Sequence, residues 1–247
     1  HNWFDHSDSR HPRIRTMSVH VWNNYFDGNS KYGVGVTYGA SAFVENNCFR
    51  NCKYPMLISL QGSDVAGGGK GTFSSENGGV IKSFGNAVTG ATRLVTYQQD
   101  ATEWDCWEAA QRSDQAPAEV KAKVGGTSYD NFDTNSEVMY DYTPDAAADV
   151  PTVVTGSYGA GRMQHGDFTW TFDNATEDKN DGVIAALKSA VQNYQPTWLG
   201  FFGINTGIRS VVSDQRSVSP LYNLQVLRVT KSNQKQIYIQ DGKKRVW

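Results

Sequence analysis

Three arginines lie within six residues near the start of the printed sequence, at Arg10, Arg13 and Arg15. Pro12 lies between the first arginine and the other two. Because its φ is fixed and it has no N–H, it restrains the backbone at that point. Guanidinium groups bind carboxylates through pairs of parallel hydrogen bonds. Arginines held in such a fixed arrangement are therefore suited to binding one anionic substrate.

The same segment allows two other interpretations. In the first, it is a basic turn whose arginines form ion pairs with Asp5 and Asp8. In the second, Asp5 and Asp8 belong to a hydrolase, which needs two carboxyl groups facing each other across a cleft. Nothing else in the sequence supports the hydrolase. The residues alone therefore leave an anion-binding site and a basic turn open.

A repeat along the first hundred residues indicates what could position these arginines. The motif Asn-x-Phe begins at Asn2, Asn24 and Asn47, with spacings of 22 and 23 residues. A variant, Phe84-Gly85-Asn86, places an asparagine 39 residues after Asn47. If the glycine-rich stretch Gly62–Gly79 contains an insertion of about 16 residues, the register is restored. Internal periods of this size are typical of stacked repeat folds.

Each repeat carries an alternating segment before its asparagine, at 17–22, 41–45 and 79–83. Alternation with a period of two predicts half-buried strands. A coil of 22 or 23 residues with short strands matches one turn of a β-helix, in which Asn24 and Asn47 would stack and hydrogen-bond as structural residues. An antiparallel sandwich with asparagines at its turns is the alternative, but the fixed spacing argues against it.

The remaining segments give weaker patterns. Residues 103–112 predict a short helix or a tryptophan-bearing loop, and 149–155 a short strand. The acidic stretch 127–181 is typical of solvated loops, with a calcium site as the alternative; its spacing does not match an EF-hand. Residues 181–194 predict a helix that Asp181 caps and whose apolar stripe packs on the β-helix.

These patterns predict three parts. Residues 1–204 form the β-helix part with its loops and packing helix, residues 205–220 a linker rich in serine, threonine and aspartate, and residues 221–247 a small tail. Within the tail, the alternating residues 236–240 precede Asp241-Gly242 and 243–247, a pattern typical of a hairpin.

Composition excludes several classes. The 247 residues carry a formal net charge of −2 and only 19% charged residues, which argues against a nucleic-acid partner. No apolar run is long enough to span a membrane. Cys48, Cys52 and Cys106 are interpreted as buried thiols, with a Cys52–Cys106 or Cys48–Cys52 disulfide as the alternative. The chain begins at His1 with no Met before Asn2, so we expect it to be the interior of a longer product, and the absence of a signal peptide is uninformative.

Residues 1–92 resemble the C-terminal half of the catalytic domain of polysaccharide lyase family 1, the pectate and pectin lyases. Four motifs occur in the family's order and spacing: His1-Asn2-Trp3-Phe4, Ser9-Arg10-His11-Pro12-Arg13-Ile14-Arg15, Val19-His20-Val21-Trp22-Asn23-Asn24-Tyr25-Phe26 and Val44-Glu45-Asn46-Asn47-Cys48-Phe49. The resemblance implies an all-β, single-stranded, right-handed parallel β-helix, truncated at its N-terminal side. Segments 153–161 and 181–194 resemble what bacterial members carry at their end.

The resemblance also implies a pectate lyase, which cleaves α-1,4-linked polygalacturonate by calcium-dependent β-elimination. Arg10 would abstract the C5 proton, and Arg15 would contact the substrate or hold Arg10 in place. Arg13 and His11 occupy variable positions in the motif and are further candidates for substrate contact. The family's Ca²⁺ ligands lie upstream of the motif, so no metal ligand is expected in this chain, and the fragment as given is expected to be inactive or nearly so. Segment 34–37 lacks a substrate arginine that some members have.

The chemistry is consistent with these roles. Removing the C5 proton of a uronate builds charge on its carboxylate, which cations must neutralise. Ca²⁺ is a hard Lewis acid suited to that task. Arginine is an unusual base because its ordinary pKa is above about 12. A nearby Ca²⁺ and a second cation such as Arg15 would disfavour the charged form.

The resemblance further implies polygalacturonate or pectin as partner, a monomer, and a secreted, cell-surface or periplasmic bacterial location. Segments 221–229 and 236–244 resemble short C-terminal sorting tails on secreted proteins of Bacteroidetes. Pectin lyase, acting on methyl-esterified pectin without calcium, is the first alternative. The second is a non-catalytic β-helix module that binds carbohydrate, because a fold does not fix a function.

Overall fold

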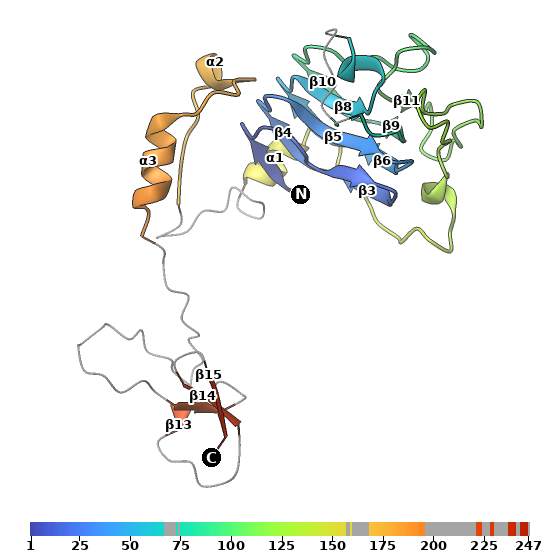
Figure 1. The fold of residues 1–247 in the computed structure, drawn as a ribbon. Helices are drawn as coiled ribbons and strands as arrows, with labels where there is room; N and C mark the ends of the chain where they lie inside the picture. Colours follow the sequence, from blue (N-terminus) through green and yellow to red (C-terminus); the bar gives the residue numbers. More distant parts are fainter. Residues whose placement is uncertain are drawn as a thin grey trace. The chain divides into compact units, whose positions relative to one another are not determined.

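The computed structural model describes residues 1–66, 73, 75–156, 159 and 168–195, and the strands 221–223, 228–229, 237–240 and 243–246. The chain forms two compact units, His1–Tyr194 and Gln195–Trp247. The first contains parallel sheets and the second a small antiparallel sheet (Figure 1). The predicted linker, 205–220, lies outside the described residues.

Three parallel sheets form the β-helix of the first unit. One contains β1 (Trp3–Asp5), β4 (Tyr25–Asp27), β7 (Cys48–Arg50) and β10 (Ala87–Thr89). A second contains β3 (Ser18–Trp22), β6 (Ser41–Glu45), β9 (Val80–Phe84) and β11 (Trp107–Glu108). The third contains β2 (Arg13–Arg15), β5 (Tyr32–Thr37) and β8 (Tyr54–Ile58). Consecutive strands join different sheets, and each pairs in parallel with the next coil, so the predicted parallel β-helix is confirmed.

The register between coils follows the asparagine repeat. Trp3 pairs with Tyr25, which pairs with Cys48, which pairs with Ala87. The asparagine of the predicted variant, Asn86, is in register with Asn47, and the strand that follows it begins at Ala87. The insertion between β8 and β9 is confirmed, and its described part includes the short helix η1 (Gly62–Asp64).

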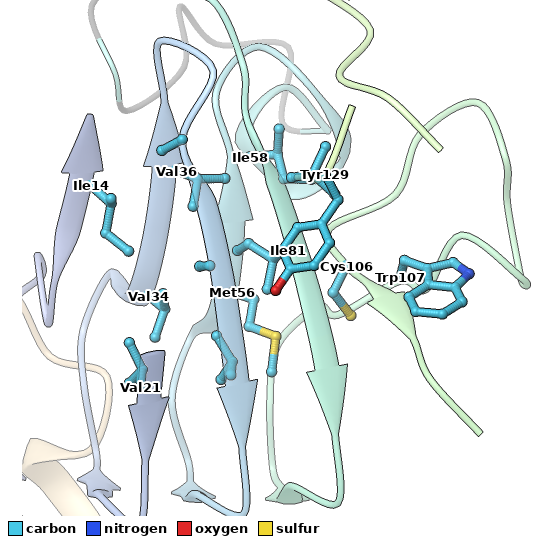
Figure 2. Packing of buried hydrophobic residues seen from close by; sticks show 14 of the residues in the cluster. Ile14, Val21, Val34, Val36, Met56, Ile58, Ile81, Cys106, Trp107 and Tyr129 are labelled. Atoms are coloured by element: carbon cyan, nitrogen blue, oxygen red, sulfur yellow. The ribbon is translucent and has the colours of Figure 1, made fainter. Parts of the chain in front are cut away.

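The interior is filled by apolar side chains that stack from coil to coil (Figure 2). The rings of Phe26 and Phe49 are parallel with centroids 4.3 Å apart, and Phe4 lies 5.0 Å from Phe26. On the third sheet, Val34 and Val36 pair with Met56 and Ile58, and all four are fully buried. β-branched and aromatic residues suit this pleated, close-packed surface.

A ladder of asparagine side chains lies at the turn that follows each strand of the second sheet. The Nδ2 of each asparagine donates to the Oδ1 of the next: Asn2 to Asn24 at 2.8 Å, Asn24 to Asn47 at 3.0 Å, and Asn47 to Asn86 at 3.1 Å. Backbone N–H groups of Asn24 and Asn47 donate to the same oxygens. Buried amides tolerate such positions only when their hydrogen bonds are satisfied, as they are here.

Segment 149–155 is helical, so the strand predicted there is wrong. Helix α1 (Val150–Thr155) has Pro151 in its first turn, where proline is tolerated. Val150 and Val154 are four residues apart and lie on one helical face. Both are fully buried and pack against Tyr25 on the first sheet. This helix, not the predicted one, covers the β-helix.

The helix predicted at 181–194 is shorter and differently placed. It is α3 (Ala185–Asn193), preceded by Ile184 at its N-cap position, so the capping role given to Asp181 is wrong. None of its residues is buried, and Val191 is 55% exposed. The predicted packing of its apolar stripe on the β-helix is therefore wrong as well. The short helix α2 (Asn174–Glu177) precedes it and is capped by Asp173.

Of the two alternatives predicted for residues 103–112, the helix is wrong and the tryptophan-bearing loop is confirmed. These residues supply β11, which continues the second sheet beyond β9. Trp104 is 2% exposed because it packs in the core. Asp105 beside it accepts hydrogen bonds from the backbone and hydroxyl of Ser63 and from the backbone of Val95.

The acidic stretch 127–181 is only partly the solvated loop that composition predicts. Asp133, in the short helix η2 (Phe132–Thr134), forms an ion pair of 2.6 Å with Lys82 of β9, and both side chains are fully buried. Asp178 binds Arg50 through both carboxylate oxygens. These acidic residues attach the later loops to the β-helix.

The second unit contains four short strands: β12 (Leu221–Asn223), β13 (Arg228–Val229), β14 (Ile237–Gln240) and β15 (Lys243–Val246). They pair in antiparallel fashion, and β14 pairs with β15 in the register of a hairpin. The predicted hairpin is confirmed, whereas its Asp241-Gly242 turn lies outside the described residues.

All three cysteines are free thiols, as predicted. Cys52 and Cys106 are buried in the core, and burial raises the pKa of Cys52 to about 12, so this thiol stays protonated. Cys48 is partly exposed. Among the described residues, no helix has the length and apolar character needed to cross a membrane.

The ladder predicts a measurable loss of stability for Asn47→Ala. This change removes the acceptor of the Asn24 backbone N–H and one donor to Asn86 Oδ1, and each buried group left without a partner costs about 1–3 kcal/mol. Urea unfolding followed by circular dichroism should show the loss. The exposed Asn193, at the end of α3, provides a matched Asn→Ala control whose stability should change little. Equal stability of the two variants would contradict a structural role for the ladder.

Candidate active site

Arg10 lies in the turn between β1 and β2, immediately before the third sheet. Its φ is +71°, a left-handed conformation that a non-glycine residue rarely adopts. The side chain is exposed, and its Nη1 donates to Ser9 Oγ at 3.3 Å. Within the described part of the chain, Arg10 takes part in no ion pair with a carboxylate.

His11 faces the interior, followed by Pro12 with a cis peptide bond. The His11 ring lies 4.8 Å from the ring of Phe4 and contacts Ser7 Oγ at 2.8 Å. Burial lowers the pKa of His11, so its imidazole is neutral at neutral pH. His11 thus packs the turn against the core and anchors the loop that carries Arg10.

Arg13 and Arg15 lie on the outer face of β2, because Ile14 between them points into the core and side chains alternate along a strand. Both bind Glu76. Arg13 Nη2 lies 2.7 Å from Glu76 Oε2, and Arg15 donates to both oxygens, from Nε at 3.1 Å and from Nη2 at 2.5 Å. Thr37 of β5 donates to the same carboxylate at 2.8 Å.

This cluster fixes the charge of its members. The hydrogen bonds from Arg15, with those from Arg13 and Thr37, lower the pKa of Glu76 to about 2. The same contact raises the pKa of Arg15, which therefore remains a cation. Arg15 is nevertheless 52% exposed, whereas Arg13 is 13% exposed, so only Arg15 presents much of its guanidinium to solvent.

The interpretation of this segment as a basic turn whose arginines pair with Asp5 and Asp8 is wrong. Asp5 contacts His6 at 2.6 Å, and Asp8 contacts Lys31 at 3.1 Å. Arg13 and Arg15 pair with Glu76 instead, which lies 61 residues after Arg15 in the insertion between β8 and β9. No periodic or local pattern in the sequence points to Glu76, since the contact depends on how the insertion folds.

Two cavities lie near these elements. One of about 310 Å³ is bordered by Arg10, His11 and Pro12 together with inward-facing residues of the first coil, such as Phe4 and Val19. It lies against the interior of the coil and not along the outer face that carries Arg15. A larger cavity of about 500 Å³, on another side of the β-helix, is lined by Arg112, Tyr142 and residues 133–136 and 139–141, among others. Arg112 there donates hydrogen bonds to Glu45 and Tyr142.

Within the residues that the structure describes, no group of three or more histidine, cysteine or acidic side chains is arranged to hold a metal ion. The alternative of a calcium site in the stretch 127–181 is therefore not supported for the described part of that stretch. Its buried acidic residues have protein partners, Lys82 for Asp133 and Arg50 for Asp178.

The depressed pKa of Glu76 makes the effect of Glu76→Gln depend on pH. A lowered folded-state pKa contributes stability that is present above the ordinary glutamate pKa and lost as the pH falls through about 2. The variant should be less stable than the parent at neutral pH, and the difference should shrink below about pH 4.5. Thermal unfolding across this range measures it. Glu119→Gln, at an exposed position, should show no such convergence.

The sequence of this chain matches a known protein family. A family model described as pectate lyase matches residues 1–161. A pectate trisaccharide-lyase of Bacillus licheniformis is 40% identical over 57 residues, which are 23% of this chain and 17% of that protein. Pectate lyase C of Dickeya chrysanthemi is 26% identical over 162 residues, 66% of this chain and 36% of that protein.

Among solved structures, pectate lyase II of Xanthomonas campestris pv. campestris has 23% identity, with 65% of this chain and 40% of that chain covered and a TM-score of 0.38. The chain spans only 17% and 36% of the lengths of the two sequence relatives above. The pectate lyase family model, however, matches well over half of the residues of this chain. This chain belongs to the pectate lyase family.

Proposed function

We propose that this chain carries the proton-abstracting side of a pectate lyase that acts on α-1,4-linked polygalacturonate. The observation that supports this most is the difference between neighbouring arginines. Arg13 and Arg15 are paired with Glu76, whereas Arg10 is exposed and forms no ion pair among the described residues. Arg10 is therefore the arginine whose guanidinium is free to approach the acidic proton of the substrate.

The proposed reaction is a β-elimination. A base removes the proton from C5 of a galacturonate unit, and the electron pair of that C–H bond forms a double bond between C4 and C5. The bond between C4 and the glycosidic oxygen breaks, and that oxygen leaves as the new reducing end after it gains a proton. The products are a 4,5-unsaturated oligogalacturonide and a shortened chain.

In this proposal Arg10 is the base. The exposed part of Arg15 binds the substrate carboxylate and offsets the charge that develops on it. We assign Arg13 and His11 to positioning instead of substrate contact, because Arg13 is mostly covered and His11 packs on Phe4.

Calcium is part of the proposal as the cofactor of the complete enzyme, where it would supply Lewis acidity toward the substrate carboxylate. Among the described residues, no group of three or more histidine, cysteine or acidic side chains is arranged to bind this ion. We also propose a secreted, cell-surface or periplasmic bacterial monomer, with 221–247 as a tail for sorting.

The test is the formation of unsaturated product from polygalacturonate by the complete enzyme with Ca²⁺ present, followed by ultraviolet absorbance. Arg10→Lys keeps the charge but misplaces the donor atoms, and we expect a loss of about 10²- to 10⁴-fold, the usual contribution of a positioned base. Arg93→Lys, on the fourth coil, is the matched control and should keep parental activity.

Three outcomes would change the proposal. Parental activity in Arg10→Lys would exclude Arg10 as the base. Activity on methyl-esterified pectin without Ca²⁺, and none on polygalacturonate, would indicate a pectin lyase. Binding of polygalacturonate with no unsaturated product would indicate a non-catalytic module.

A further inference from the structure

Next to β2, the outer face of the third sheet is covered at strand β5 by apolar side chains. Tyr32 of β5, Leu57 of β8 and Phe73 of the insertion form a separate apolar cluster in which all three side chains are fully buried. The rings of Tyr32 and Phe73 have centroids 5.1 Å apart. If this face were open to a polysaccharide, the side chains of Tyr32 and Leu57 would be exposed to solvent. They are buried, so the face is closed at β5 and β8.

Gly35 makes this covering possible. It lies on β5 opposite Arg13 of β2. A Cβ atom at Gly35 would lie 2.6 Å from Phe73 Cζ and 2.6 Å from Tyr32 Cε2, closer than carbon atoms approach one another. Any larger residue at this position would push Phe73 off the sheet, so the glycine and the phenylalanine depend on each other.

Glu76 attaches the same part of the insertion to β2 and β5. Its carboxylate binds Arg13, Arg15 and Thr37, and its carbonyl accepts a hydrogen bond of 2.5 Å from Ser59. The guanidinium of Arg13 also lies 5.2 Å from the centre of the Phe73 ring, within the range of a cation–π contact. Phe73 and Glu76 are therefore held through the same arginine.

We infer that Phe73 and Glu76 form a wall that ends the substrate-binding face of the third sheet at β2. Resting on the proposed function, this makes Phe73 a specificity-determining residue. A polygalacturonate chain bound at Arg10 and Arg15 stops at the wall and does not continue over β5 and β8. Neighbouring strands lie about 4.8 Å apart. The wall therefore prevents the substrate from contacting a width of about 10 Å, which corresponds to the two strands β5 and β8. A glycosyl unit is comparable in length to one strand spacing, so one or two binding positions for sugars are lost.

The face beneath the wall keeps a polar group. The hydroxyl of Tyr32 is buried and has no hydrogen-bond partner among the described residues. A buried hydroxyl without a partner is unfavourable, so it would gain a hydrogen bond from any sugar that reached it. Removing the Phe73 ring should therefore create a new binding position, and Tyr32 should supply part of its affinity.

The experiment measures the affinity of the full chain for galacturonate oligomers of increasing length by calorimetry. For the parent, affinity should stop rising at a definite length. In Phe73→Ala this limit should move to oligomers longer by one or two units, with a several-fold gain for the longest. Adding Tyr32→Phe to Phe73→Ala should remove part of that gain. Phe172→Ala, which removes a ring stacked on His6 beyond the first sheet, is the matched control and should keep the parental limit.

The outcomes separate the wall from the proposed function. If the parent binds no oligomer of any length, the proposed function fails. If it binds oligomers and Phe73→Ala keeps the parental limit, the wall is overturned. Circular dichroism checks that the variants are folded. Should Phe73→Ala not fold, Phe73→Val shortens the side chain while keeping it apolar, and an unchanged limit in that variant would equally overturn the inference.

Discussion

Hydrogen bonds between asparagine side chains on successive coils hold the register of the whole β-helix. Asn24 and Asn47 each accept from the amide of the preceding coil and donate to the next, while also bonding the backbone. A strand shifted by one residue would reverse which side chains face inward. The ladder therefore determines that Ile14 lies in the core and that the two arginines beside it lie outside.

The site follows from that register by short steps. The turn between β1 and β2 is held from inside by His11, whose ring packs on Phe4, so the neighbouring Arg10 is directed to the surface. Arg13 and Arg15 are then drawn to one carboxylate across the sheet edge. Three similar cations within six residues thus acquire different surroundings, and only the first keeps a guanidinium without an ionic partner among the described residues.

What could be predicted from the sequence is what repeats locally. The strands, their parallel register and the inserted stretch follow from asparagines at fixed spacing, because the same contacts recur on every coil. Glu76 could not be found in this way, since it meets Arg15 only after the insertion folds back across the sheet. The buried pair of Lys82 and Asp133 is similar, because each residue alone reads as a surface charge.

Helices were the least predictable elements. The segment at α1 was mistaken for a strand because valines favour strands, yet Val150 and Val154 pack on Tyr25 only if they lie on one helical face. At α3 the spacing correctly indicates a helix, but its apolar side chains remain exposed and the predicted packing on the β-helix is absent. Periodicity indicates a local conformation and does not show whether a partner surface exists.

The insertion between β8 and β9 leaves the strands on either side of it in register with the coil before. The stacked strands and the length of the connecting loops are thus independent of each other. New contacts for a substrate can be gained, lost or rebuilt in such a loop over evolutionary time while the core beneath it stays the same. A family built on this plan can diversify the ends of its binding face one connection at a time.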